Sequence, residues 1–265
     1  MLQVVVDFRD EVDELHGFLQ TLKAEQWERE TGFMEWTPWD VVAHLHYFDV
    51  VSMASLEGEE AFAPEKQTII DGVVAGRTNK QIAGERFGKL GVAELLSEWH
   101  TTAHALAKTL GESDPKRRLP WFGPDMGVPM FTTARYMEVW AHGQEIYDLV
   151  GVTRRDTDRI KNIATIGIKT FGWTFVNRSQ EVPGPPPYVR LVAPSGEIWE
   201  WNEPSDDSVR GSAVDFCHVV TQGRNVEDTA IEATGPVAKQ WMAIAQCFAG
   251  GPVDPPKPGT RGIQH

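Results

Sequence analysis

Four stretches of the chain repeat apolar residues at intervals of three and four positions. They span residues 2–27, 37–56, 92–110 and 132–150. This is the spacing of an α-helix that buries one face, so each stretch predicts an amphipathic helix. Four helices of this length, joined by short or irregular links, are typical of a helix bundle. The pattern therefore constrains the first part of the chain to a largely helical fold.

Capping and turn residues support these limits. Thr37 can cap the second helix, Pro38 fits its first turn, and Asp40 stands three residues after the cap. Gly111 and Gly151 are suited to end the third and fourth helices. We therefore expect the helices to end at these glycines.

The pattern changes beyond a fifth helix that is predicted at residues 158–177. A segment rich in Pro follows it and is suited to be a linker. Alternating apolar residues on both sides of Pro194-Ser195-Gly196 predict a β-hairpin, and shorter helices and a strand follow. The expected fold class is mainly α, with a four-helix bundle followed by a small α+β domain. The expected divisions are residues 1–180 for the bundle, 181–250 for the α+β domain and 251–265 for a flexible tail.

The charge balance narrows the class of partner. The chain has 25 Lys+Arg and 38 Asp+Glu, a formal net charge of −13 at pH 7. This charge disfavours non-specific binding to nucleic acid or to an anionic membrane. No apolar run reaches the ~18 residues of a membrane-spanning helix, and the N-terminus lacks the basic segment of a signal peptide. We expect a cytoplasmic protein with a small-molecule substrate; a homodimer is one assembly that the sequence leaves open.

The two cysteines, Cys217 and Cys247, are too few for a disulfide framework and are not spaced as C-x-x-C. We interpret them as small buried apolar side chains, which leaves the chain without a cysteine in a convincing catalytic context.

The predicted helices separate the histidines by the face on which they lie. At about 100° per residue, His44 shares a face with Val41, Phe48 and Val51, whereas His46 points to the opposite side. Taken alone, His44 is compatible with a core histidine that is bonded to a backbone carbonyl.

Glu138 and His142 lie one turn apart on the apolar face of the fourth predicted helix. A buried carboxylate without a partner is costly, so Glu138 could form a simple ion pair with Arg135 or His142. The alternative is a chelate in which His44 joins Glu138 and His142. Such a site would have three protein ligands with open positions, and bundle cores are where such sites are built.

A second pair, His100 and His104, also lies one turn apart. The stretch H-T-T-A-H lacks the Glu of the H-E-x-x-H zinc motif, and the pair lies beside the apolar stripe of its helix. We interpret these histidines as a flanking or solvent-facing pair, and we expect no metal there.

Two segments resemble a known family. W-T-P-W-D-V-V-A-H-L at residues 36–45 and R-Y-M-E-V-W-A-H-G-Q-E at residues 135–145 resemble the metal-binding N-terminal domain of mycothiol-dependent maleylpyruvate isomerases, which belongs to the DinB-like four-helix superfamily. The resemblance implies that His44, Glu138 and His142 bind a divalent metal, usually zinc. The later segment from Pro187 to Trp201 is similar to the small α+β domain of the same isomerases, whereas the Pro/Gly-rich stretch around Trp121-Phe122 has no counterpart there.

The resemblance also implies a mechanism. The metal would activate a low-molecular-weight thiol such as mycothiol for S-transfer to an electrophilic small molecule, or for its isomerisation. An arginine of the second domain would bind an anionic substrate, for which Arg224 is the candidate, and Arg135 is an alternative cation or a partner of the metal ligands. Two other functions stay open: a metal-assisted hydrolase or lyase that uses zinc-bound water, with Asp40 as base, and a non-catalytic metal- or ligand-binding protein.

Overall fold

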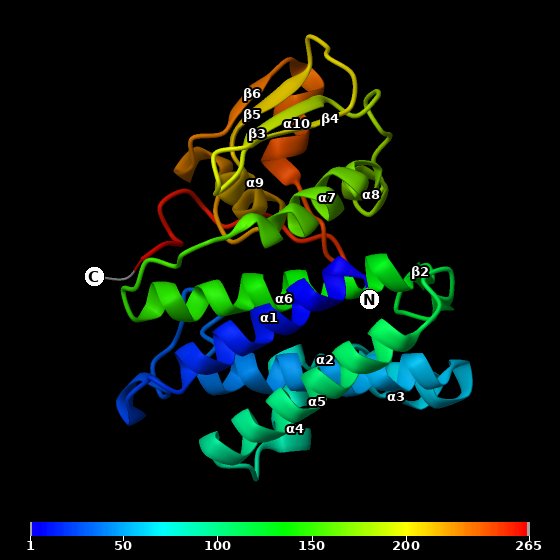
Figure 1. The fold of residues 1–265 in the computed structure, drawn as a ribbon, viewed down its shortest axis with the longest axis vertical. Coiled ribbons are helices and arrows are strands. Elements are labelled where there is room, and N and C mark those ends of the chain that lie inside the picture. Colours follow the sequence, from blue (N-terminus) through cyan, green and yellow to red (C-terminus); the bar gives the residue numbers. More distant parts are fainter. Residues whose placement is uncertain (1, 264–265) are drawn as a thin grey trace. The chain divides into compact units, whose positions relative to one another are not determined.

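The computed structural model describes residues 2–263 and divides into two compact units, Met1–Val150 and Gly151–His265 (Figure 1). The first unit contains the predicted bundle, whose four long helices are α1 (Gln3–Leu19), α2 (Pro38–Glu57), α5 (Val92–Glu112) and α6 (Val128–Leu149). Helices α1 and α2 each pack against both α5 and α6. The four-helix bundle expected from the periodicity is therefore confirmed.

The limits of these helices differ from the expected ones. Helix α1 ends at Leu19 instead of continuing to residue 27, and a 3-10 turn at Ala24–Gln26 follows it. Helix α5 continues through Gly111 to Glu112, because a glycine is tolerated inside the last turn. Helix α6 begins at Val128, since Pro129 occupies its first turn and is pre-organised for that position.

Two helices lie in a segment that the sequence left irregular. They are α3 (Glu59–Val74) and α4 (Asn79–Phe87), and both pack on α2. Only Phe62, Ile69 and Gly72 of α3 are buried, so its sequence carries little of the periodic signal that reveals a helix. A small antiparallel pair, β1 (Arg118–Leu119) and β2 (Met126–Gly127), brackets the Pro/Gly-rich loop before α6.

The second unit begins earlier than expected. The predicted fifth helix consists of a 3-10 turn at Asp158–Ile160, α7 (Lys161–Lys169) and α8 (Phe171–Val176). Helix α7 packs on α9 (Ala213–Val220), and α8 contacts α10 (Pro236–Ile244). Because α7 and α8 pack against later helices of the same unit, the division falls at residues 150–151 and not near residue 180.

A four-stranded sheet forms the rest of the second unit, in the order β4-β3-β5-β6. The expected hairpin is present: β3 (Tyr188–Val192) pairs antiparallel with β4 (Ile198–Trp201). Strand β5 (Ser208–Ser212) pairs parallel with β3 and antiparallel with β6 (Glu232–Thr234). Strand β5 was not predicted, because S-V-R-G-S shows no apolar alternation. The expected fold class, mainly α with a small α+β part, is confirmed.

The expected flexible tail is held against the second unit as far as the structure describes it. Asn225 donates to the Pro256 carbonyl (2.8 Å), Gly259 donates to Asp228 (2.8 Å), and Arg261 donates to the Gln222 carbonyl (3.2 Å). Residues 264–265 of the predicted tail lie outside the described residues. The described part of the tail is therefore a packed segment, because its hydrogen bonds tie it to the 3-10 turn Val226–Asp228 and its flanks.

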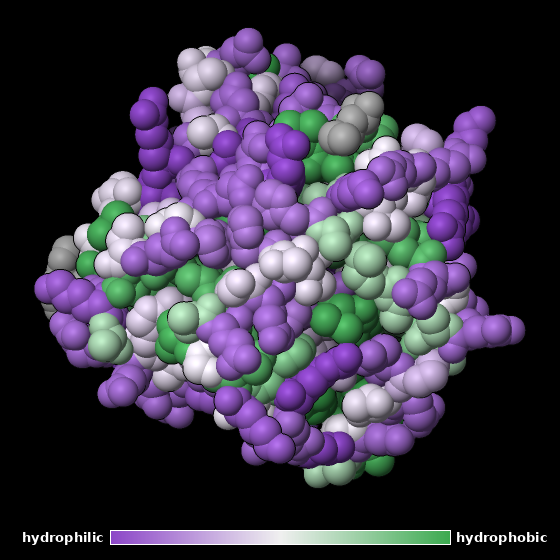
Figure 2. All heavy atoms as spheres, turned by 60° about the horizontal axis from the view of Figure 1, so that its bottom comes forward, coloured by the Kyte–Doolittle hydropathy of each residue, from purple (hydrophilic) through white to green (hydrophobic). Residues whose placement is uncertain are grey.

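The surface carries no large apolar area on the face drawn in Figure 2, where hydrophobic side chains lie in small groups between hydrophilic ones. Scattered apolar side chains of this kind are normal on a folded protein. Among residues 2–263, no helix has both the length and the apolar character needed to cross a membrane.

Candidate metal centre

Three side chains predicted as metal ligands meet in the first unit. His44 comes from α2, and Glu138 and His142 come from α6. Nε2 of His44 lies 3.4 Å from Oε2 of Glu138, and Nε2 of His142 lies 3.3 Å from the same oxygen. The two imidazole rings are 4.6 Å apart at their centroids. We refer to these three residues as the inner trio.

The local sequence explains how α2 and α6 hold these positions. Thr37 and Asp40 cap the start of α2 reciprocally, each satisfying a backbone N–H of the other, so the helix begins at a fixed residue. On α6, Gly143 follows His142 directly and faces α1, where an added Cβ would lie 3.1 Å from the methyl groups of Leu15. A glycine at this position therefore allows α1 and α6 to pack closely beside His142.

Burial controls the protonation of the inner trio. Desolvation lowers the pKa of His44 to about 4, although Glu138 opposes the shift, so this imidazole is neutral at neutral pH. Desolvation alone would raise the pKa of Glu138, but the hydrogen bonds of His142 and His44 outweigh it and hold the pKa well below its usual range. A neutral imidazole beside an ionised carboxylate is the protonation state in which both groups can bind a metal ion.

The donor set and its spacing fit a divalent metal. Two imidazole nitrogens and one carboxylate oxygen are the ligand types of catalytic zinc sites, which keep a fourth position open. Around a tetrahedral zinc ion with bonds of about 2.0–2.1 Å, neighbouring ligand atoms lie about 3.3 Å apart. The Nε2 to Oε2 distances of 3.4 and 3.3 Å match that spacing and are longer than ordinary charge-assisted hydrogen bonds. His44, Glu138 and His142 would therefore be the residues that hold the ion.

Aromatic rings surround the inner trio. Trp36 stacks on His142 with centroids 5.4 Å apart and an interplanar angle of 9°, and Phe33 meets the same imidazole edge-on at 5.1 Å. Phe48, one turn after His44, lies 4.8 Å from that ring. Phe48 also contacts Trp121 and Phe122 of the Pro/Gly-rich loop, at 6.4 and 6.1 Å. The sequence assigned this loop no position in the fold, and the structure places two of its aromatic rings beside Phe48, which contacts His44.

The sequence left open an ion pair between Arg135 and Glu138, but in the structure Arg135 pairs with a different carboxylate. Its Nε and Nη2 donate to Oδ1 of Asp49 (3.1 and 2.9 Å), and Nη2 also donates to the Leu45 carbonyl (3.3 Å). Both charged side chains are buried, and Trp99 donates to the other oxygen of Asp49 (3.2 Å). These bonds favour a role in holding α2, α5 and α6 together over the role as a substrate-binding cation that the sequence suggested.

The carboxylate of Asp40 is also occupied by contacts within the fold. Its Oδ2 accepts from the backbone N–H and the hydroxyl of Thr37, each at 2.8 Å, and lies 3.0 Å from Nζ of Lys80. These contacts favour a structural role as a helix cap over the role as general base.

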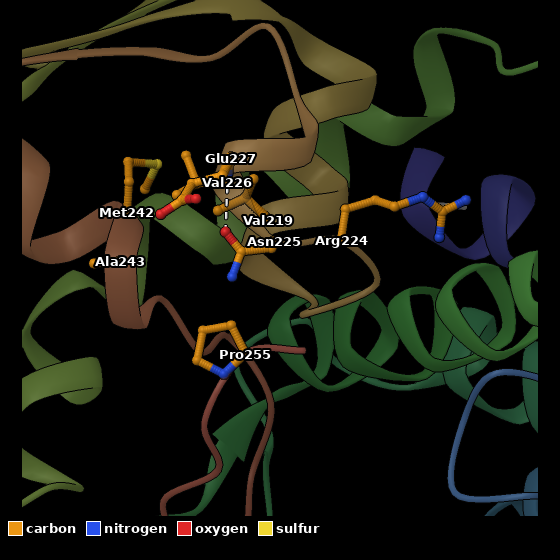
Figure 3. A pocket seen from close by; sticks show the side chains of 8 residues that line it. All are labelled: Val219, Arg224, Asn225, Val226, Glu227, Met242, Ala243 and Pro255. Atoms are coloured by element: carbon orange, nitrogen blue, oxygen red, sulfur yellow. Dashed lines mark hydrogen bonds between the residues drawn. The ribbon is translucent and has the colours of Figure 1, made fainter. Parts of the chain in front are cut away.

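Arg224 belongs to the second unit, where it lines a pocket together with residues that include Glu227 and Met242. Figure 3 shows its guanidinium extending away from the other side chains of that pocket. Its Nη1 donates to the neighbouring Gly223 carbonyl at 2.7 Å. A role of Arg224 in substrate binding stays a prediction.

Both cysteines are buried, as expected. Burial raises the pKa of the Cys217 thiol well above its usual value, so this thiol stays protonated at neutral pH.

The sequence missed one group of metal-binding residue types. His100 and His104 are part-exposed, as expected, but both rings point to Asp13 of α1. The sequence showed the spacing of the two histidines, but it did not show which helix lies opposite them.

Comparisons with known proteins show which family the chain resembles. Residues 8–147 match the family described as the mycothiol maleylpyruvate isomerase N-terminal domain. Two uncharacterised proteins from two strains of Mycobacterium tuberculosis are each 37% identical to the chain over 250 residues, covering 94% of this chain and 96% of theirs.

Two solved structures share the fold. A crystal structure of the mycothiol-dependent maleylpyruvate isomerase superposes with a TM-score of 0.55 at 14% identity, covering 88% of this chain and 94% of that one. A histidine-to-alanine mutant of the isomerase superposes with a TM-score of 0.56 at 13% identity over the same shares. At this identity the match concerns the fold, which extends over both units. Since the family match covers more than half of the sequence and includes all three residues of the inner trio, the chain belongs to the mycothiol maleylpyruvate isomerase N-terminal domain family.

Proposed function

We propose that this protein is a metal-dependent enzyme, with zinc as the metal, that uses a low-molecular-weight thiol such as mycothiol. The thiol is transferred to an electrophilic small molecule or isomerises it. The observation that carries the proposal is the convergence of His44, Glu138 and His142 on one point at distances that suit a metal ion. Membership in a family named for a mycothiol-dependent isomerase supports the choice of thiol and reaction.

A divalent metal in the inner trio would supply Lewis acidity that favours the deprotonated form of an incoming thiol. The residues of the chain hold the ligands in place and shape their surroundings. Trp36 keeps the His142 ring parallel to its own, and Phe33 and Phe48 restrict how the two imidazoles can turn. These aromatic side chains also limit the access of water, which strengthens electrostatic interactions at the site.

The aromatic side chains favour an acceptor with a flat or apolar portion. Trp121 and Phe122 continue the aromatic surroundings beyond Phe48, and both are only part-buried. A conjugated alkene could stack on such rings, and offset stacking contributes about 0.5–1.5 kcal/mol beyond the burial of area.

The central test compares metal content and thiol dependence. His142→Ala in the full-length protein should lose most of its zinc, because a site with two protein ligands is weak, and should lose turnover of maleylpyruvate with mycothiol. His46→Gln is the matched control, since His46 is buried on the same helix as His44 but faces Glu98 at 3.5 Å. This control should keep its zinc and its turnover.

The outcomes separate the competing functions. Turnover by wild-type protein that requires added thiol supports the proposal. Turnover that proceeds equally without thiol would identify a hydrolase or lyase, and a zinc-loaded protein that turns over none of a panel of electrophilic alkenes would identify a binding protein. Stoichiometric zinc in folded His142→Ala would contradict the ligand assignment.

We also propose, from the resemblance to the isomerases, that Arg224 binds the carboxylate of an anionic substrate. Arg224→Gln should raise KM for a carboxylate substrate about tenfold or more and leave metal content unchanged, because a charge-assisted hydrogen bond contributes ~1.5–3 kcal/mol. Arg190→Gln, a change at a part-exposed arginine of β3 that lies 3.7 Å from Glu200, is the matched control and should leave KM as it is. An unchanged KM in Arg224→Gln would remove this residue from the proposal.

A further inference from the structure

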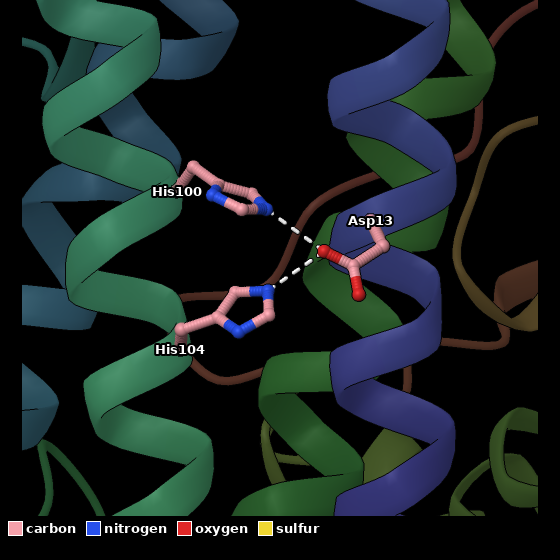
Figure 4. Close-up of side chains that lie close together, drawn as sticks. All are labelled: Asp13, His100 and His104. Atoms are coloured by element: carbon pink, nitrogen blue, oxygen red, sulfur yellow. Dashed lines mark hydrogen bonds and ion pairs between the residues drawn. The ribbon is translucent and has the colours of Figure 1, made fainter.

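A second group of metal-ligand side chains lies on the outer side of the bundle, between α1 and α5. Nε2 of His100 lies 2.8 Å from Oδ1 of Asp13, and Nε2 of His104 lies 2.7 Å from the same oxygen (Figure 4). We call Asp13, His100 and His104 the outer cluster. Its side chains are 47%, 31% and 35% exposed, so solvent and ions reach it directly.

The arrangement has the features of a chelate. His100 and His104 are one turn apart on α5, so both rings leave the same face of one helix. Figure 4 shows both Nε2 atoms directed at the Asp13 carboxylate, which comes from the neighbouring helix. One ligand atom from each residue lies within 4.8 Å of the others, as in the inner trio. The two groups therefore offer the same donors, two imidazole nitrogens and one carboxylate oxygen.

We propose that the outer cluster is a second metal site, which binds a divalent transition ion of the zinc class and joins α1 to α5. Nitrogen and oxygen donors together select ions such as Zn²⁺, Co²⁺, Ni²⁺ and Cu²⁺, whereas Mg²⁺ and Ca²⁺ prefer oxygen donors alone. With three protein ligands, water completes the coordination. This inference is independent of the proposed enzymatic function, because it depends only on the geometry of the outer cluster.

The two Nε2 to Oδ1 distances of 2.8 and 2.7 Å are those of hydrogen bonds, so metal binding requires a small expansion of the outer cluster. Neighbouring ligands of a tetrahedral zinc ion lie about 3.3 Å apart, so Asp13 must move away from the two imidazoles by about half an ångström. All three side chains are part-exposed and can turn without disturbing the core. Each neutral imidazole moves its proton from Nε2 to Nδ1, and a protonated one releases a proton, so that the Nε2 lone pair faces the ion.

A neighbouring imidazole limits how the outer cluster can move. His16 of α1 stacks on the His100 ring with centroids 4.1 Å apart and an interplanar angle of 29°, which restrains the ring.

The test counts metal ions in the full-length protein. After treatment with a chelator, wild-type protein should take up two equivalents of Zn²⁺ in calorimetric titration and in elemental analysis after dialysis. His100→Ala/His104→Ala should take up one, and His44→Ala/His142→Ala should also take up one. Lys108→Ala, an exposed change on α5 one turn beyond His104, is the matched control and should still take up two.

A single substitution and a second metal test the outer cluster even if a double substitution unfolds the chain. Asp13→Asn preserves the shape of the side chain but removes its charge, and it should weaken the outer equivalent about tenfold or more while the inner one is unchanged. Titration with Ca²⁺ should give no binding at the outer cluster. Equal Zn²⁺ uptake by wild-type protein and by folded His100→Ala/His104→Ala would overturn the proposal. An outer equivalent that survives Asp13→Asn with unchanged affinity would exclude Asp13 as a ligand and overturn it as well.

Discussion

One substitution at the buried pair of Arg135 and Asp49 distinguishes a structural role of Arg135 from a role in substrate binding. The exposed fractions of the two side chains are 3% and 0%, and two guanidinium nitrogens of Arg135 bond one oxygen of Asp49. Arg135→Met retains the length of the side chain but leaves the carboxylate buried without its cation. Breaking a buried pair in this way costs about 3–5 kcal/mol. For a chain of this length, such a loss lowers the melting temperature by about 6–20 °C.

The pH dependence gives a second measurement of the same effect. Burial raises the pKa of Asp49 even with Arg135 present, and removing the arginine should raise it further. The folded state then binds more protons than the unfolded state between the unfolded and folded pKa values. Stability therefore falls as pH rises through this window and stays low above it. The deficit of Arg135→Met relative to wild type should be larger at pH 8 than at pH 5.

Urea denaturation followed by circular dichroism measures these free energies. The double variant Arg135→Met/Asp49→Leu should lose less stability than the sum of its two single variants, because it leaves neither charge alone. Zinc content should fall in Arg135→Met, since the pair links the helices that carry the inner trio. An unchanged free energy of unfolding together with a raised KM would refute this reasoning and return Arg135 to the role of a substrate-binding cation.

Two further predictions concern packing and the nucleophile. Gly143→Ala should destabilise the protein by about 1–3 kcal/mol in urea denaturation, because its Cβ would lie 3.1 Å from Leu15; Gly17→Ala, where an added Cβ meets nothing within 4 Å, should not be destabilising. Equal stabilities of the two variants would contradict the close approach of α1 and α6. Cys217→Ala/Cys247→Ala should keep its turnover with added thiol, and loss of turnover in a folded, metal-loaded double variant would make a cysteine of the chain the nucleophile.

The inner trio could be predicted because each residue lies on a strongly periodic helix. A helical wheel identifies the face of a side chain, and His44, Glu138 and His142 lie on faces that the structure buries or partly buries. The wheel does not identify the neighbouring helix or the height at which two helices meet. For that reason Arg135 was placed on the correct face, while its partner Asp49 was missed.

The same distinction explains the outer cluster and the two extra helices. The pair His100 and His104 was recognised from its spacing, but Asp13 could not be assigned to it, because the sequence does not specify that α1 lies beside α5. Helices α3 and α4 were missed for another reason. They bury few residues, so their sequences show little periodicity, and packing on α2 stabilises them.

The inner trio joins two helices that are far apart in sequence, since Glu138 follows His44 by 94 positions. An ion that binds only the folded arrangement stabilises it by mass action, and each tenfold excess of free ion over Kd adds about 1.4 kcal/mol. The melting temperature of the protein should then rise with the concentration of free zinc. Heating the chain at a series of buffered zinc concentrations would thus measure the affinity of the site without any substrate, and a cell that is short of zinc would hold a less durable form of the protein.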